Sequence, residues 1–167
     1  SKTKYVKTSC FDEIVLGGGT PSVLGAEQII DLINYCKANF NLNKEYFIKV
    51  SGSSKTLELP KIKKLAEYGV YQVDMGAQTF DDKLRKALCL PDSAADVEAA
   101  IKYARSLGLV VCADIMYNLP GQTLEILKKD IQKTLNLNVE SADCYALELL
   151  PETKLFNQIQ SGELSLK

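Results

Sequence analysis

Short apolar segments alternate with amphipathic helical segments along the whole chain, and this alternation is typical of βα units in a parallel sheet. Each apolar segment leads into a polar or glycine-rich loop and then into apolar residues at helical spacing. In the first helical segment Ile29, Leu32, Ile33 and Cys36 recur at i, i+3, i+4 and i+7. The sequence therefore predicts an α/β fold of five βα units. We expect strands at Glu13–Leu16, Tyr46–Val50, Tyr71–Met75, Val110–Met116 and Ala142–Leu149.

Residues with special backbone or capping properties mark the ends of the helices. The segment Ser51–Ser54 predicts a turn after the second strand, and Gly69 predicts the C-terminal cap of the next helix. Ser93 and Thr123 are expected to cap the N-termini of two later helices. Apolar stripes predict the residues that face inward, namely Ile62, Leu65 and Ala66, then Leu84, Ala87 and Leu88, then Val97, Ala100, Ile101, Ala104 and Leu107, and finally Leu124, Leu127, Ile131 and Leu135.

Composition narrows the class of protein. With 46% hydrophobic and 25% charged residues, the 167-residue chain fits one globular domain over residues 1–167. Its 20 basic residues are balanced by 21 acidic ones, so nucleic acid and membrane surfaces are poor partners and a small molecule is favoured. The start of the chain has no apolar leader segment, which favours a cytoplasmic location. The absence of histidine excludes mechanisms that need imidazole.

The cysteines do not form a recognisable framework. Their number is odd and their positions are far apart, which argues against both a disulfide scaffold and a closely spaced metal motif. We expect most of them to be buried as small apolar residues. The five are Cys10, Cys36, Cys89, Cys112 and Cys144.

Three loops or strand ends carry residues suited to binding. The segment Gly17–Pro21, Gly-Gly-Gly-Thr-Pro, lets backbone amides approach a ligand, although a tight turn is the simpler reading. It lacks the lysine and spacing of phosphate loops. Asp114 interrupts an otherwise apolar strand and therefore needs a hydrogen-bond partner or a ligand, and Gln78 follows the third strand. Because loops after parallel strands gather at one edge, we expect these residues to share one site.

Three ordered motifs resemble the oxygen-independent coproporphyrinogen III oxidase group of the radical S-adenosylmethionine (SAM) superfamily. This group includes haem chaperones and enzymes that open the haem ring anaerobically. The similarity extends from about Phe11 to Phe156, and the resemblance implies a partial parallel (β/α) barrel of the radical SAM type. The motifs are Gly17–Ser22, Met75–Asp82 and Asp114–Thr123, and the segments Tyr145–Leu147 and Pro151–Thr153 resemble the end of the barrel in that group.

The resemblance implies SAM as a cofactor, with the glycine loop at its methionine amino group and Met116 beside its adenine. In the family a CxxxCxxC loop holds a [4Fe-4S] cluster, and reductive cleavage of SAM gives a radical that removes a hydrogen atom from a substrate. For the oxidase this substrate is a tetrapyrrole propionate that then loses carbon dioxide. The positions implied to bind SAM are Gly17, Gly18, Gly19, Thr20, Pro21, Ser51, Gln78, Asp114, Met116 and Tyr145.

The chain departs from the family pattern at several positions. It contains no CxxxCxxC, and only Cys10 lies near the place where that loop belongs. The acidic residue of the family falls at Ser51 and its arginine near Leu90, so two contacts to SAM are lost, while Asn118 replaces a glycine. We expect the first βα unit to be missing from this chain, the parent protein to hold the cluster, and the chain alone to perform no radical chemistry.

Three readings remain open from the sequence. The first is a radical SAM enzyme of tetrapyrrole metabolism, and the second is a module that binds haem or SAM without reacting. The third is an unrelated doubly wound α/β domain with a phosphate at the glycine loop. In the first two cases the strand Glu13–Leu16 would lack a neighbour, so we also expect self-association through that edge.

Overall fold

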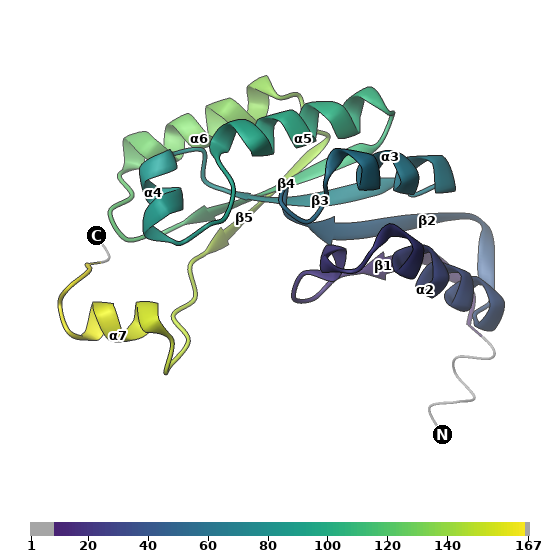
Figure 1. Ribbon diagram of the computed structural model, residues 1–167, viewed down its shortest axis with the longest axis horizontal. Coiled ribbons are helices and arrows are strands. Elements are labelled where there is room, and N and C mark those ends of the chain that lie inside the picture. Colours follow the sequence, from purple (N-terminus) through teal and green to yellow (C-terminus); the bar gives the residue numbers. More distant parts are fainter. Residues whose placement is uncertain (1–8, 166–167) are drawn as a thin grey trace.

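The computed structural model describes residues 9–165 and contains one five-stranded parallel sheet. The strands follow each other in chain order, β1-β2-β3-β4-β5, without the reversal of a doubly wound sheet. They alternate with helices and curl into a half-barrel (Figure 1), which confirms the expected partial parallel (β/α) barrel of five βα units. The strands are β1 (Phe11–Leu16), β2 (Leu42–Gly52), β3 (Gln72–Gln78), β4 (Val110–Tyr117) and β5 (Ser141–Ala146).

The helices connect the strands and cover one face of the sheet. Figure 1 shows α3, α5 and α6 next to one another over the central strands. The expected caps are confirmed, because the Ser93 hydroxyl accepts from Asp96 N, the Thr123 hydroxyl accepts from Ile126 N, and Gly69 is left-handed with φ 101°. The helical elements are η1 (Pro21–Val23), α2 (Ala26–Asn39), α3 (Leu59–Tyr68), α4 (Asp82–Ala87), α5 (Ala94–Ser106), α6 (Leu124–Asn136) and α7 (Lys154–Gln160).

The hydrophobic core lies between the sheet and these helices. Alternate residues of each strand point into it, as the period of two along a strand requires. It includes Ile14, Ile48, Val50, Val73, Met75, Val111 and Ile115 on the strands and Ile29, Ile33, Ile62, Leu65, Val97 and Ile101 on the helices.

The intervening residues of each strand point to the opposite side, which we call the inner face. The registers between neighbouring strands set these residues side by side. The inner face consists of Lys49, Ser51, Gln72, Asp74, Gly76, Gln78, Cys112, Asp114, Met116, Ser141, Asp143 and Tyr145.

Several expected strand boundaries are wrong. β2 extends to Gly52 because Ser51 pairs with Asp74 and Gly52 pairs with Met75, and β3 extends to Gln78 because Gln78 pairs with Ile115 of β4. At Ser51 and Gly52 the pairing with β3 outweighs the turn preference of serine and glycine. β5 ends at Ala146, since its partner β4 ends at the paired Tyr117.

The expected inward stripe of α6 is also wrong. Leu124, Ile131 and Leu135 are exposed, whereas Asp130 and Thr134 are buried. The helix turns this polar side inward because the Asp130 carboxylate binds the loop after β3. The other stripes hold apart from Leu32, Ala87 and Leu107, which are exposed at the outer side of α2, at the end of α4 and at the C-cap of α5.

The cysteines differ from the expectation as well. Only Cys112 is buried, Cys36 is half-buried, and the other three are exposed. Whether a cysteine is buried depends on which face of its helix or strand it occupies, and composition does not give that face.

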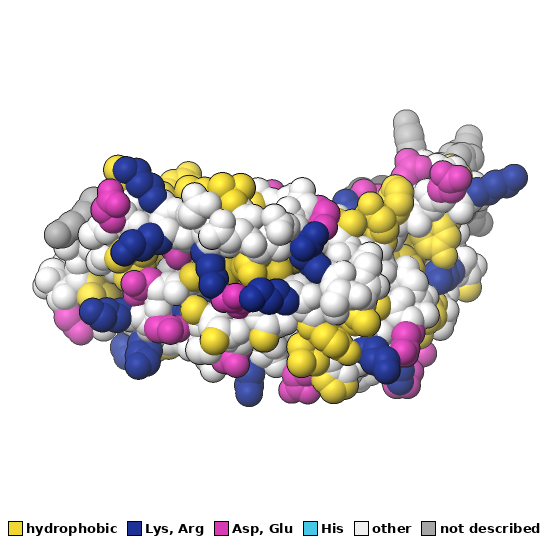
Figure 2. All heavy atoms as spheres, turned by 90° about the horizontal axis from the view of Figure 1, so that it is seen from above, with side chains coloured by type: hydrophobic (Ala, Val, Ile, Leu, Met, Phe, Trp, Pro, Cys, Tyr) yellow, Lys and Arg dark blue, Asp and Glu magenta, His cyan; other side chains and the backbone are white. Residues whose placement is uncertain are grey.

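Among residues 9–165, no helix combines the length and apolar character that a membrane crossing needs. Figure 2 shows basic and acidic side chains interspersed over the helical side.

We propose that β1 pairs with β1 of a second copy of this chain. Within residues 9–165 β1 has a strand neighbour on one side only, and a hollow of about 210 Å³ at that edge is lined by Phe11, Ile14, Phe40 and Leu42. Unpaired, apolar strand edges favour addition of another strand. We expect concentration-dependent dimers in light scattering and weaker dimers in the variant Val15→Lys. A sharp monomer peak at high concentration would contradict this proposal.

Candidate functional site

The glycine loop opens the site at the carboxyl end of β1. Gly18 and Gly19 have φ values of 75° and 48°, in the left-handed region that glycine adopts without strain. A Cβ at either position would meet no atom within 4 Å, so this backbone faces open space. A Cβ at Gly17 would lie 3.8 Å from Ser51 Oγ, which places the loop directly beside the end of β2.

Buried polar contacts anchor the glycine loop from behind. Ser22 is fully buried, and its hydroxyl lies 2.5 Å from the hydroxyl of Thr56. Lys61 Nζ donates to the carbonyl oxygens of Ser22, Leu24 and Thr56 at 2.6, 2.9 and 2.7 Å. These contacts hold the start of η1 against the loop after β2, so the glycine loop and the loop after β2 are fixed to each other.

Gln78 has an unusual backbone that its surroundings hold in place. Its φ is 62°, which is rare for a residue with a side chain and persists only where neighbouring contacts impose it. Its amide folds over Gly76, where a Cβ would lie 2.9 Å from Gln78 Nε2. Arg85 Nη1 donates to the carbonyls of Ala77 and Thr79 at 2.7 and 2.8 Å, on either side of Gln78.

Asp130 of α6 holds the next part of the same loop. Its two carboxylate oxygens accept from Thr79 Oγ1 and from Phe80 N, each at 2.7 Å. Burial raises the pKa of Asp130, while these two hydrogen bonds act in the opposite direction. The Arg85 and Asp130 side chains therefore clamp the loop that presents Gln78 to the inner face.

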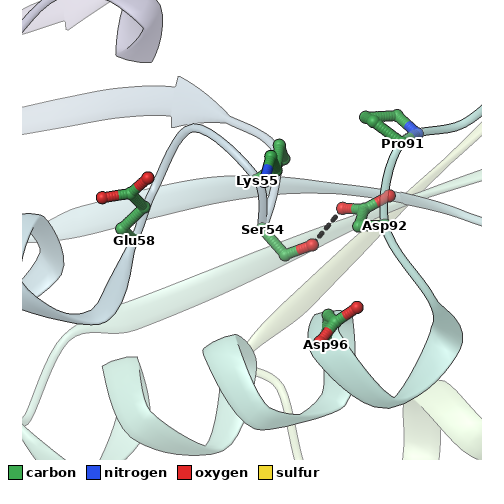
Figure 3. Close-up of a pocket in the computed structure, with 6 residues that line it drawn as sticks. All are labelled: Ser54, Lys55, Glu58, Pro91, Asp92 and Asp96. Atoms are coloured by element: carbon green, nitrogen blue, oxygen red, sulfur yellow. Dashed lines mark hydrogen bonds between the residues drawn. The ribbon is translucent and has the colours of Figure 1, made fainter.

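Arg85 belongs to a buried network that the sequence did not reveal. Its side chain is 2% exposed and pairs with Asp92, which also accepts from the Ser54 hydroxyl (Figure 3). The network joins α4 to the loops before α5 and after β2. A cavity of about 240 Å³ beside it is lined by Ser54, Lys55, Glu58, Pro91, Asp92 and Asp96. None of these six residues is on the inner face, so we assign this region a supporting role.

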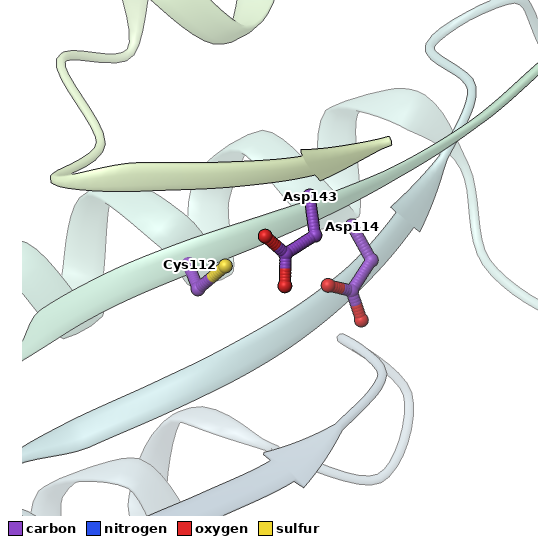
Figure 4. A group of neighbouring side chains, drawn as sticks. All are labelled: Cys112, Asp114 and Asp143. Carbon is purple, nitrogen blue, oxygen red and sulfur yellow. The ribbon is translucent and has the colours of Figure 1, made fainter. Parts of the chain in front are cut away.

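Two carboxylates and a thiol gather on the inner face. The side chains of Cys112, Asp114 and Asp143 lie with one ligand atom each within 4.8 Å of the others (Figure 4). Burial, followed by repulsion from Asp74 and Asp143, raises the pKa of Asp114 to about 6. Burial also raises the pKa of the Cys112 thiol. The cluster therefore favours a ligand that brings positive charge or hydrogen-bond donors.

Tyr145 and Met116 continue the inner face beyond this cluster. They pair across β4 and β5, and the Tyr145 hydroxyl donates to Asp143 at 3.0 Å. This hydrogen bond is the main reason that the pKa of Tyr145 is raised to about 12. Asn118, just after β4, has φ 62°, a conformation that asparagine tolerates better than most residues with a side chain. The replacement of glycine at this position is therefore compatible with the turn.

The structure brings the expected positions together. Ser51, Gln78, Asp114, Met116 and Tyr145 lie on the inner face, with Gly17–Pro21 at its edge. Sequence reasoning missed Asp74, Cys112 and Asp143 on the same face. The signal was available, because each is two residues along a strand from another inner-face residue.

The donor set fits SAM but not an iron-sulfur cluster. Open glycine backbone, an amide and free carboxylate oxygens suit the ammonium, sulfonium and ribose hydroxyls of SAM. Among the described residues no hydrogen bond engages the Asp114 carboxylate, so both of its oxygens are available to a ligand. The five cysteines are free and scattered over the fold, and they do not provide three ligands to one cluster.

A parallel βα half-barrel with polar residues at the carboxyl ends of its strands is the arrangement of a (β/α)-barrel protein that binds its ligand at that end. The chain belongs to the radical SAM superfamily, whose family model matches residues 3–148. It is 35% identical over 158 residues to the heme chaperone HemW of Bacillus subtilis (strain 168), covering 92% of this chain and 41% of that protein. It is 29% identical to coproporphyrinogen III oxidase, anaerobic 1, of Cereibacter sphaeroides, and this match covers 89% of this chain and 35% of that protein.

The fold comparison gives the same class. The solved structure of coproporphyrinogen III oxidase (HemN) from Escherichia coli, a radical SAM enzyme, superposes with a TM-score of 0.82 at 24% identity. The match covers 93% of this chain and 36% of that chain. The chain thus spans less than half the length of these relatives, and its fold is that of their radical SAM barrel.

We expect Asp114→Asn to stabilise the protein at neutral pH. The folded-state pKa of Asp114, about 6, lies above the ordinary 3.8, so the fold favours the protonated carboxyl. The stability that this preference contributes is fully present below pH 3.8 and is lost as the pH rises through 6, where the carboxyl ionises. Asparagine at this position carries no charge and avoids that loss. For a half-exposed group, solvent screening reduces the gain at pH 7.5 to about 1 kcal/mol. Urea unfolding of both proteins from pH 4 to 8 measures it.

The control for this prediction is Asp31→Asn on the exposed side of α2, which should change the free energy of unfolding by less than about 0.5 kcal/mol. A stability difference between Asp114→Asn and the unmodified protein that shrinks as the pH rises would contradict the assignment.

Proposed function

We propose that this chain is the SAM-binding barrel portion of a radical SAM oxidoreductase of porphyrin and haem metabolism. The observation that carries the proposal is the convergence of the glycine loop, Gln78 and Asp114 at one end of the inner face. SAM, when bound and reduced, supplies the agent that removes a hydrogen atom from a substrate. The chain's own residues bind and orient it.

The proposed reaction is the oxidative decarboxylation of tetrapyrrole propionate side chains, in which the agent derived from SAM takes one hydrogen atom, carbon dioxide leaves, and an external one-electron acceptor takes the remaining electron. The curated relative named as an anaerobic coproporphyrinogen III oxidase supports this choice. The inner face contributes Gln78 and Asp114 as hydrogen-bonding partners of SAM, and its apolar side chain Met116 as a surface for the adenine. The ligands of a cluster would come from outside this chain, which has no suitable set of cysteines.

A second candidate is a haem-binding protein that does not perform this reaction. The 35% identity to a relative named heme chaperone HemW favours it. In that case the same inner face holds SAM, and haem binds without losing propionate carbon. A haem-degrading protein that opens the haem ring by a SAM-dependent route is a further form of this alternative.

The test uses the full-length protein after anaerobic reconstitution with iron and sulfide. We expect reductive cleavage of SAM, with carbon dioxide released from coproporphyrinogen III. Tight haem binding with SAM cleavage but no carbon dioxide would favour the chaperone, and a linear tetrapyrrole product would favour haem degradation. Absence of SAM binding under saturating conditions would overturn the proposal itself. Gln78→Ala, with Gln132→Ala on α6 as a matched control, links the result to the inner face.

A further inference from the structure

At position 51 this chain has a serine where the family pattern has an acidic residue, and Asp74 lies beside that serine. Ser51 and Asp74 are register partners on β2 and β3, so they lie at the same height along the barrel. Ser51 Oγ donates to Asp74 Oδ2 at 3.3 Å. A carboxylate thus occupies the space into which a longer acidic side chain at position 51 would extend.

The position of Ser51 locates this carboxylate relative to the glycine loop. Ser51 Oγ is the nearest atom that a Cβ at Gly17 would meet, at 3.8 Å. Asp74 is therefore one side chain away from the loop proposed to receive the methionine end of SAM. Ser51 thus lies beside both the Asp74 carboxylate and the glycine loop.

Asp74 is held in a defined orientation and keeps acceptor capacity. Gln72 Nε2 donates to its Oδ1 at 2.6 Å, and Ser51 donates to Oδ2, so each oxygen accepts one hydrogen bond. A carboxylate has about four acceptor sites, which leaves one at each oxygen for a ligand. A half-buried carboxylate fixed by two donors is preorganised to bind a cation.

The charge on the inner face favours a cation at this place. Asp74, Asp114 and Asp143 carry carboxylates, while the one basic residue among the described inner-face residues, Lys49, pairs with Glu13 at 2.8 Å. Asp74 also contributes to the raised pKa of Asp114, which shows that their charges interact. An ammonium group next to Asp74 would offset this repulsion.

We propose that Asp74 binds the methionine ammonium of SAM and so replaces, from the adjacent strand, the carboxylate lost at Ser51. This inference rests on the proposed function, because it assumes that SAM occupies the inner face. It makes Asp74 a binding residue that determines affinity for the amino-acid part of SAM. It also accounts for a serine at position 51 without loss of the site.

Titration calorimetry on the full-length protein tests this with two ligands. S-adenosylhomocysteine carries the amino-acid part, and 5′-methylthioadenosine lacks it. We expect Asp74→Asn to lower the affinity for S-adenosylhomocysteine about tenfold or more, because a charge-assisted hydrogen bond is lost. The affinity for 5′-methylthioadenosine should not change. Asp31→Asn is the matched control, and circular dichroism verifies that each variant is folded.

The swapped variant Ser51→Glu/Asp74→Ser gives a second readout. We expect its affinity for S-adenosylhomocysteine to return to within about threefold of the unmodified protein, because the carboxylate is restored from the other strand. Equal weakening of both ligands by Asp74→Asn, or a swapped variant no better than Asp74→Ser, would overturn the inference. Failure of the unmodified protein to bind either ligand would overturn the proposed function instead.

Discussion

Replacing Arg85 by methionine should lower the free energy of unfolding by about 3–5 kcal/mol, the cost of leaving a buried charge without its partner. The Arg85 and Asp92 side chains are 2% and 5% exposed. The same change removes the donors to the carbonyls of Ala77 and Thr79. Because these carbonyls flank Gln78, we also expect weaker SAM binding. Equilibrium urea unfolding followed by circular dichroism measures the stability change.

The control for Arg85 is Arg105→Met. Arg105 pairs with Glu140 at 3.1 Å, but the two side chains are 33% and 39% exposed, so the expected loss is only about 0–1 kcal/mol. The double variant Arg85→Met/Asp92→Asn should recover part of the stability, since it removes the unpaired carboxylate charge. Equal losses for the Arg85 and Arg105 variants would contradict the role assigned to the buried network.

Replacing Gly52 by alanine should cost about 2–3 kcal/mol and disturb the glycine loop, because the added methyl group has no space. Its Cβ would lie 2.7 Å from Ser22 Cβ and 2.8 Å from Leu57 Cγ, both fully buried residues. Ser22 fixes the start of η1 and with it the loop Gly17–Pro21. Thermal and urea unfolding measure the loss, and calorimetry with SAM measures the effect on binding.

Gly25→Ala is the matched control for Gly52. Gly25 has an ordinary φ of −64°, and its nearest neighbour beyond the adjacent residues would be 3.5 Å from the new Cβ, so we expect a loss below about 1 kcal/mol. Adding Ser22→Gly to Gly52→Ala should restore part of the stability by removing one of the two contacting side chains. A Gly52 variant as stable as the Gly25 variant would contradict this packing argument.

The alternation of apolar segments and helices was enough to predict the class of fold. Strands such as Val110–Tyr117 are apolar and β-branched, and the caps at Gly69, Ser93 and Thr123 follow from local chemistry alone. The gathering of Gly17–Pro21, Gln78 and Asp114 followed from topology, because carboxyl ends of parallel strands meet at one edge. These features depend on near neighbours or on the direction of the chain.

The supporting network could not be predicted in the same way. Charged residues on a helix are usually exposed, so nothing in the local sequence distinguishes Arg85 and Asp130 from surface residues. The partner of Asp130, Thr79, lies 51 residues away, and only the packed fold brings the two together. The same limit explains α6, whose apolar residues suggested one inward side while a buried carboxylate required another. Asp74 lies within the expected strand Tyr71–Met75, but the family motif on this strand begins only at Met75, so Asp74 was not considered as a site residue.

The crystal structure of the full-length protein with SAM bound tests the central claim most directly. We expect SAM on the inner face, with its methionine end at Gly17–Pro21 and with Gln78 and Asp114 within hydrogen-bonding distance of its polar groups. SAM bound elsewhere, or an inner face without SAM at saturating concentration, would contradict the account.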